Sequence, residues 1–304
     1  MVDYIQRMNS TKIGTVKTMI SIGGSEFNFV KKSSDISRFI DSIITFITKY
    51  NLDGIDIDWE FPYLTNDKKN FSKLLKMIRS RFDHMEQNFH RKLLLSVAIT
   101  PIMYIADKSY QISIISKYVS FVNLMTYDYH VPNTFPYTNY NSPLYSSQYD
   151  LLYFKYFNVY FSAHYMHYRG LRREQIIIGI PFYGYMYYLA DPRFHSVYSL
   201  HNGTQVSINY NEICSNMNTS KATRVFDRIT KVPYLYEGIR WISYDDEESI
   251  TIKSQWIVDN GYGGAMSFAL NYDLFKNDSD SYLCSQKQLF PLQSTINDIL
   301  NDVN

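Results

Sequence analysis

Hydrophobic positions along the chain follow two alternating patterns. Short runs rich in β-branched and aliphatic residues are followed by longer amphipathic stretches, and this rhythm predicts repeated βα units with a parallel sheet. The short runs predict strands over 16–24, 53–60, 93–100, 121–127, 176–180 and 264–270. The amphipathic stretches predict helices over 36–50, 68–85, 110–117, 151–168 and 250–260, and the tail PLQSTINDIL predicts a closing helix.

The segment 185–243 interrupts this rhythm. It is polar, rich in Asn and Tyr, and longer than a loop between a strand and a helix should be. We therefore interpret it as an inserted subdomain. Residues 1–184 and 244–304 are then the first and last parts of one α/β domain, whose six strands are two short of the eight in a closed (β/α)8 barrel.

One predicted strand carries three acidic residues on the same face. In NLDGIDIDWEFPY, Asp56, Asp58 and Glu60 occupy positions i, i+2 and i+4, while Ile, Ile and Trp occupy the positions that point the other way. Burying three carboxylates together is costly unless they accept hydrogen bonds or share protons. We expect at least one of them to stay protonated near neutral pH, as a general acid must. A solvated edge strand and a calcium-binding loop are the alternatives, and the apolar Ile-Ile-Trp face argues against both.

Composition and charge narrow the range of partners. The chain has 304 residues, and 30 basic against 29 acidic residues give a net charge of +1, so no net field favours nucleic acid or an anionic membrane. No apolar run approaches the ~20 residues that cross a bilayer. The opening sequence has no apolar segment typical of a signal peptide. The 29 Tyr side chains suit carbohydrate as well as they suit a protein core.

The acidic strand resembles a known family signature. DGIDIDWEFP is similar to the DGxDxDWExP motif of family 18 chitinases, which are glycoside hydrolases. Further segments resemble the family in the same order: SIGG its third strand, LLLSVAIT its fifth, LMTYDYH its sixth, YNSPLY the following loop, GIPFYG its seventh and GGAMSFALNYD its eighth. The resemblance implies a (β/α)8 TIM barrel with a small α+β insertion after the seventh strand.

The resemblance also implies a reaction and its residues. The family hydrolyses β-1,4-linked N-acetylglucosamine polymers with retention, by a substrate-assisted route. Glu60 would be the general acid, Asp58 would orient the substrate acetamido group, Asp56 would tune Asp58, and Tyr127 would donate a hydrogen bond to the acetamido oxygen. Four residues would line the sugar sites: Met125, Asp128, Tyr183 and Phe268. We expect no metal and no other cofactor, chitin or its oligosaccharides as partner, no nucleic acid or membrane partner, and a monomer.

The two cysteines fall where the resemblance implies a disulfide. Cys214 lies in the inserted segment and Cys284 follows the eighth strand, so a bridge would tie the insert to the barrel. Two buried free thiols are the alternative. A disulfide would place folding in a secretory compartment, and we expect the full-length protein to be extracellular.

Several positions depart from the family pattern. Only about fifteen residues precede the SIGG strand, where the family has two strands and a helix, so we expect that the start of the protein is missing from this sequence. Phe268 stands where the family has a Trp at the floor of the site, and Tyr185 stands where an Arg is common. A chitin-binding protein without turnover, or an inactive fragment, is therefore the alternative to an active chitinase.

Overall fold

The fold was analysed in a computed structural model, which describes residues 16–24, 27, 33–89, 91–202, 206–216, 221–275, 284 and 289–301. The chain forms two compact units. The first unit contains Met1–Leu124 and Met166–Ile176, and the second contains Met125–Tyr165 and Ile177–Asn304. Each unit is described on its own below.

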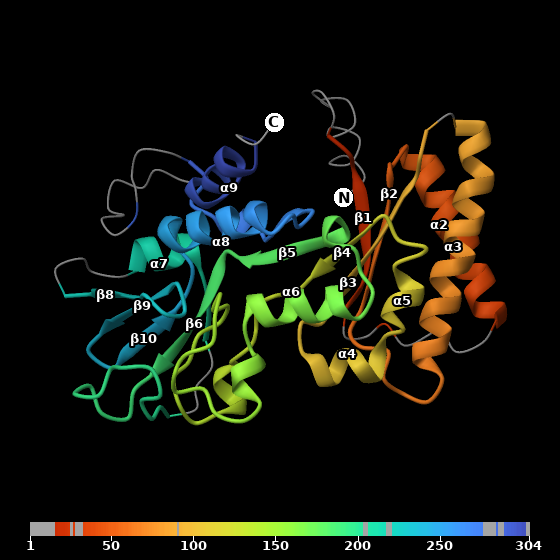
Figure 1. Ribbon diagram of the computed structural model, residues 1–304. Coiled ribbons are helices and arrows are strands. Elements are labelled where there is room, and N and C mark those ends of the chain that lie inside the picture. The colour runs from red at the N-terminus through yellow and green to blue at the C-terminus, as the bar shows by residue number, and fades with distance from the viewer. Residues whose placement is uncertain are drawn as a thin grey trace. The chain divides into compact units, whose positions relative to one another are not determined.

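The first unit contains four parallel strands in sequence order (Figure 1). They are β1 (Met19–Gly24), β2 (Gly54–Trp59), β3 (Leu94–Ile99) and β4 (Phe121–Leu124). The helices between them are α2 (Ser33–Tyr50), α3 (Asp67–Phe89), α4 (Met103–Ser109) and α5 (Ile112–Ile115). The four predicted strands of this unit and their parallel pairing are confirmed.

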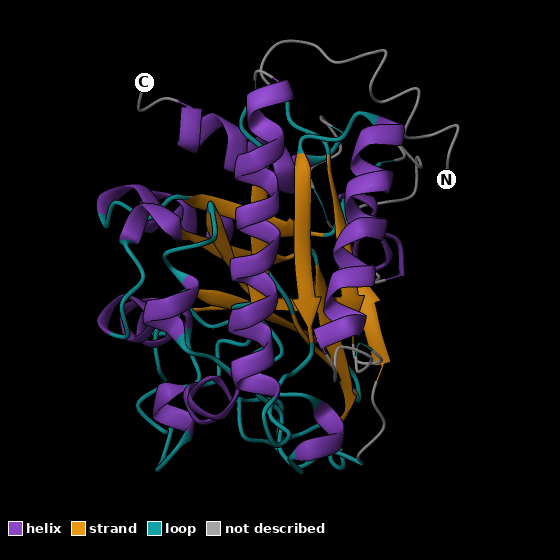
Figure 2. Cartoon of the chain, turned by 90° about the vertical axis from the view of Figure 1, so that its right-hand side faces the viewer, coloured by secondary structure: helices purple, strands orange, loops and turns teal. Residues whose placement is uncertain are grey.

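Two long helices cover one face of these strands, as Figure 2 shows. The reason lies in the spacing of apolar residues along α2, where four isoleucines recur at three- and four-residue intervals and are at most 5% exposed. Helix α3 repeats the pattern. Its buried apolar side chains are Phe71, Leu74, Leu75, Ile78, Phe82 and Met85. These two stripes bury the outward side of the sheet.

The second unit contains one parallel pair of strands and an antiparallel sheet. Strands β5 (Ile176–Pro181) and β11 (Gly264–Phe268) pair in parallel. Helix α6 (Val159–Tyr168) begins in this unit's first segment, and α8 (Glu247–Asp259) and α9 (Pro291–Asn301) flank β11 in the sequence. The predicted strands 176–180 and 264–270 and the closing helix are therefore present.

The antiparallel sheet occupies the segment that the sequence sets apart. Its strands lie in the order β7-β6-β10-β9-β8. Their bounds are β6 Tyr183–Tyr188, β7 Val206–Asn209, β8 Thr223–Asp227, β9 Val232–Glu237 and β10 Arg240–Ser243, with α7 at Tyr210–Asn216. The first of these strands in the sequence, β6, starts at Tyr183, two residues before the predicted boundary at residue 185.

Tyrosines surround a fully buried tryptophan in the second unit. Trp241 is 0% exposed. Its ring centroid lies 5.0 Å from that of Tyr234, 5.4 Å from that of Tyr187 and 6.4 Å from that of Tyr140. These three tyrosines therefore pack in the core around Trp241.

The expected disulfide is confirmed. Cys214 on α7 is bonded to Cys284, and their Cα atoms lie 5.3 Å apart, within the range that a disulfide bridges. No described helix has the apolar length that a bilayer crossing needs.

Some element boundaries differ from the sequence-based prediction. The helix expected from residue 151 begins at Val159, after a short 3-10 turn, Phe154–Tyr156. Its start is set by Asn158, whose side-chain oxygen accepts the Phe161 N–H at 2.8 Å, as an N-cap residue does. Strand β4 ends at Leu124, and helix α4 was not predicted.

Candidate active site

Strand β2 separates an apolar face from an acidic face. Ile55 and Ile57 are 0% exposed, and Trp59 packs on Phe71 of α3 with 6.1 Å between ring centroids. Because side chains alternate along a strand, the acidic residues point to the side away from this helix. Glu60 follows the last residue of β2.

Asp56 is fixed by donors from three other strands, β1, β3 and β4. Its Oδ2 accepts a hydrogen bond from Ser21 Oγ at 2.8 Å. Its Oδ1 accepts from Ser96 Oγ at 2.6 Å and from Asn123 Nδ2 at 3.1 Å. The side chain is 8% exposed, so these bonds replace the water it loses. Asp56 is therefore held as an acceptor in one orientation.

Asp58, two residues later, has a different environment. Burial raises the pKa of its carboxyl from 3.8 to about 7, and the negative charges of Glu60 and Asp56 raise it further in the same direction. Its Oδ1 is buried and has no hydrogen-bond partner among the described residues. A pKa of about 7 means that Asp58 is present both as the acid and as the carboxylate near neutral pH.

A glycine lets β1 lie close to Asp58. A Cβ atom at Gly23 would stand 1.8 Å from the Asp58 carbonyl oxygen, and the φ angle of Gly23 is +159°. No other residue fits this approach without moving one of the two strands. Gly23 of SIGG therefore allows the close approach of β1 to the part of β2 that carries Asp58.

Tyr110, which was not predicted, lies near this group. The side chain is 0% exposed. Burial raises the pKa of its hydroxyl, and the charges of Asp58 and Glu60 raise it further. The phenol therefore stays protonated beside the two carboxyl groups.

In the second unit, aromatic candidates form a separate group. The ring of Tyr127 stacks on that of Phe268 with 5.7 Å between centroids, and Tyr183 meets both rings edge-on at 6.0 and 6.3 Å. Tyr272, which was not predicted, packs on Phe268 and Tyr183. Met125 packs against the same cluster. Phe268 is 45% exposed, so its ring can still stack on a ligand.

Asp128 is held by two tyrosine hydroxyls. Its Oδ1 accepts from Tyr183 Oη at 2.5 Å and from Tyr185 Oη at 2.7 Å. Burial raises the pKa of both tyrosines, and the Asp128 carboxylate raises it further. Tyr185, which stands where the family commonly has Arg, thus contacts Asp128 through a neutral donor.

The structure therefore gathers the predicted residues into two groups, each within one unit. Asp56, Asp58 and Glu60 form one, and the aromatic residues with Asp128 form the other. The partners Ser96 and Asn123 were missed. Ser21 and Ser96 align with Asp56 across the strands, so a polar residue in register with Asp56 was the available signal. Within the described ranges, no cluster of three or more His, Cys, Asp or Glu could hold a metal ion.

Comparison with known proteins agrees with the resemblance seen in the sequence. The model of glycosyl hydrolases family 18 matches residues 2–273. A probable endochitinase of Caenorhabditis elegans is 33% identical over 311 residues, which cover 96% of this chain and 49% of that protein. The chain thus spans about half the length of this relative.

Solved structures show the same fold. An immunomodulatory active chitinase from Trichuris suis superimposes with a TM-score of 0.89 at 32% identity, covering 97% of this chain and 83% of that one. Human YKL-39, described as a pseudo-chitinase with retained chitooligosaccharide binding, gives a TM-score of 0.88 at 27% identity, covering 99% and 85%. The fold is that of a (β/α)8 barrel with an antiparallel insertion, and the strands before SIGG in the family have no counterpart among the residues described. The chain belongs to family 18 of the glycosyl hydrolases.

Proposed function

We propose that this protein hydrolyses β-1,4-linked N-acetylglucosamine polymers, with retention of configuration at the anomeric carbon. The observation that carries the proposal is the contrast between two carboxyl groups on β2. Asp56 accepts three hydrogen bonds, whereas the pKa of Asp58 is raised to about 7 beside Glu60. Neighbouring carboxyl groups whose environments differ in this way are typical of acid–base sites.

The proposed reaction proceeds in two steps. Glu60 donates a proton to the glycosidic oxygen while the substrate's own acetamido oxygen attacks the anomeric carbon, so the bond to the leaving sugar breaks and an oxazolinium ion forms. Asp58 receives a hydrogen bond from the acetamido nitrogen and stabilises the positive charge. Glu60 then removes a proton from water, which opens the oxazolinium ion and restores the acid.

Residues of the second unit are assigned supporting roles. Tyr127 donates a hydrogen bond to the acetamido oxygen, a role that suits a neutral phenol. Phe268 offers an exposed ring for stacking on a sugar, and Met125, Asp128 and Tyr183 line the sugar sites. Phe has less area than Trp and no indole donor, so we expect weaker binding than in family members with Trp at this position.

The second candidate function is chitooligosaccharide binding without turnover. It is favoured by the likeness to YKL-39, which retains binding as a pseudo-chitinase, and by Phe268 and Tyr185 at drifted sugar-site positions. The presence of Glu60, Asp58, Asp56 and Tyr127 favours the enzyme.

Substitution Glu60→Gln tests the proposal. The amide keeps the shape of the side chain but has no proton to donate, so hydrolysis of a chromogenic N-acetylated chitooligosaccharide should fall by orders of magnitude while binding changes little. Glu174→Gln is the matched control, because Glu174 is exposed and belongs to the same unit. Its kcat and KM should equal those of the wild type.

The substrate supplies a second control. A deacetylated oligosaccharide offers an amine and no acetamido oxygen, so the wild type should not cleave it. Binding of N-acetylated oligosaccharides without any turnover by the full-length wild type would reject the enzyme and establish the binding protein. Cleavage of the deacetylated substrate would reject the substrate-assisted route.

We also propose that the protein is extracellular and monomeric. The Cys214–Cys284 disulfide supports an oxidising compartment. Detection of the full-length protein in the culture medium, as a single species of monomer mass, would agree with both statements.

A further inference from the structure

The backbone of Asp128 adopts the left-handed conformation. Its φ angle is +58°, in the left-handed region that costs energy for residues with a side chain, although Asp tolerates it better than most. The residue is exposed, yet its Oδ1 is anchored by the hydroxyls of Tyr183 and Tyr185. Contacts from neighbouring residues must therefore hold Asp128 in this left-handed conformation, in which its carboxylate accepts both tyrosine hydrogen bonds.

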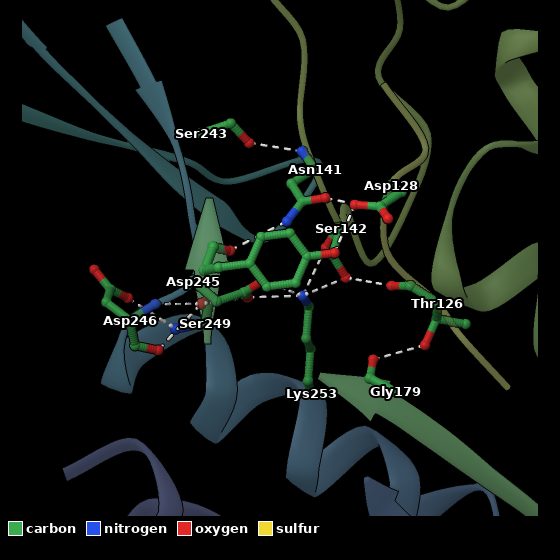
Figure 3. A network of polar contacts seen from close by, with 11 residues as sticks. Thr126, Asp128, Asn141, Ser142, Gly179, Ser243, Asp245, Asp246, Ser249 and Lys253 are labelled. Carbon is green, nitrogen blue, oxygen red and sulfur yellow. Dashed lines mark hydrogen bonds and ion pairs between the residues drawn. The ribbon is translucent and has the colours of Figure 1, made fainter. Parts of the chain in front are cut away.

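Asn141 supplies the contacts that hold this backbone (Figure 3). Its side-chain Oδ1 accepts the N–H of Asp128 at 2.8 Å, and its Nδ2 donates to the carbonyl of Tyr183 at 3.1 Å. Its own carbonyl accepts the N–H of Tyr129 at 3.2 Å. Asn141 thus bonds the N–H groups of two consecutive loop residues, Asp128 and Tyr129. It also bonds the carbonyl of Tyr183 on β6, the strand whose tyrosines hold the Asp128 carboxylate.

Asn141 is itself immobilised. It is 0% exposed, and its N–H donates to Ser243 Oγ at 2.6 Å. The next residue, Ser142, accepts from Lys253 Nζ at its carbonyl at 2.6 Å and donates from Oγ to the Thr126 carbonyl at 2.6 Å. The support therefore reaches α8 on one side and the start of the Asp128 loop on the other, as Figure 3 shows.

Only a carboxamide can make both side-chain bonds of Asn141. It must accept from one backbone N–H and donate to one backbone carbonyl, which Ala and Leu cannot do and an ionised Asp can do only in part. The hydrogen bond to the Tyr183 carbonyl is buried, so loss of the amide would leave that acceptor without its donor and would also remove the acceptor of the Asp128 N–H.

We propose that Asn141 is a positioning residue that sets the orientation of the Asp128 carboxylate for sugar binding. The inference rests on the proposed function, because it takes Asp128 as a group that contacts the substrate. Asn141 itself does not touch the sugar. It acts through Asp128, and its effect should disappear when the Asp128 side chain is absent.

A double-mutant cycle tests the proposal. We compare Asn141→Ala, Asp128→Gly and the double variant on an N-acetylated chitooligosaccharide, because glycine removes the carboxylate without straining the positive φ. Asn141→Ala should lower kcat/KM about tenfold or more, with the same division between kcat and KM as Asp128→Gly. The double variant should be no slower than Asp128→Gly alone.

Asn158→Ala is the matched control. Asn158 is also a buried asparagine of the second unit, 2% exposed, and its side chain likewise bonds one backbone N–H and one backbone carbonyl. We expect it to lower thermal stability as Asn141→Ala does while leaving kcat and KM near the wild-type values. Equal kinetic losses in the two variants, or multiplying losses in the double variant, would overturn the proposal.

A crystal structure of Asn141→Ala gives a readout that does not depend on turnover. We expect Asp128 to leave its left-handed conformation and lose one or both tyrosine bonds. An unchanged Asp128 with both bonds intact would overturn the proposal even if the protein proved to have no hydrolytic activity. A wild type without turnover, together with a displaced Asp128 in the variant, would reject only the proposed reaction.

Discussion

Asp56 and Asp58 lie on the same strand but differ in the hydrogen-bond donors around them. Asp56 meets two serines and an asparagine that donate to it, whereas one oxygen of Asp58 is buried without a partner among the described residues. Desolvation without compensating hydrogen bonds disfavours the charged form, so the pKa of Asp58 rises to about 7. Nothing in the amino-acid type separates the two residues.

This raised pKa predicts a pH-dependent stability. The folded-state value of about 7 lies above the ordinary 3.8, so the favourable contribution of the protonated group is complete below about pH 4 and is lost as the pH rises through 7. Asp58→Asn mimics the protonated form at every pH. Between about pH 5 and pH 8, the stability of the variant relative to the wild type should increase by roughly 2–3 kcal/mol.

Denaturant unfolding at the two pH values measures this difference. Asp41→Asn, at an exposed residue of the same unit, is the control variant. A constant difference for Asp58→Asn would contradict the raised pKa. The same variant should lose turnover, because the amide cannot stabilise the oxazolinium charge.

Residue-level prediction succeeded where the information is local. The alternation of acid and apolar residues around Asp58 is a property of consecutive residues, and it placed the acidic face correctly relative to α3. Asn123 and Asn141 were missed because their partners lie 67 and 13 residues away, and only the folded chain defines those distances. Tyr110 was missed for the same reason.

At the level of elements, long patterns were reliable and short ones were not. Helices α2 and α3 carry buried apolar residues at three- and four-residue intervals over several turns. This spacing fits a helix and does not fit a strand. Helix α4, which was not predicted, has seven residues, and two turns carry too few positions to show a period. Helix α5 lies within the predicted range 110–117 but has only four residues. Strand ends moved by a few residues because pairing with neighbours fixes them.

Lys253 of α8 forms a buried ion pair with Asp245, and we expect this pair to be needed for stability. Lys253 is 0% exposed, and its Nζ lies 2.7 Å from Asp245 Oδ1 and 2.6 Å from the Ser142 carbonyl. Lys253→Met leaves a buried carboxylate without its cation and should cost about 3–5 kcal/mol. Adding Asp245→Asn should restore part of this loss, since the uncompensated charge is then gone.

The free energy of unfolding, measured in denaturant, tests this pair. Arg81→Met is a suitable control, because the Arg81–Asp41 pair is largely exposed and should be worth little. A Lys253→Met variant as stable as Arg81→Met would show that the buried pair is dispensable.

For the whole molecule, the family motif predicted more than any pattern of hydrophobicity. Periodicity and composition predicted βα units and an inserted segment, whereas the family resemblance predicted the barrel and the disulfide. The internal order of the insertion was not predicted, because its strands pair with neighbours that are distant in sequence and lie in the order β7-β6-β10-β9-β8.

The disulfide is expected to stabilise the second unit. Its cysteines are separated by 70 residues, and closing a loop of this length in the unfolded chain corresponds to about 4 kcal/mol. Cys214→Ala/Cys284→Ala should lower the unfolding free energy by up to this amount. Reductant should destabilise the wild type to the same level and leave the variant unchanged, and equal stabilities in oxidising buffer would contradict the expectation.

The tyrosines around Trp241 also have a spectroscopic consequence. Rings within 5.0 to 6.4 Å of an indole transfer their excitation to it efficiently, so Tyr140, Tyr187 and Tyr234 should emit little light of their own in the folded protein. When this core opens, tyrosine emission should appear as the rings separate from the indole. The unfolding of the second unit can therefore be followed by its own fluorescence, without any added label.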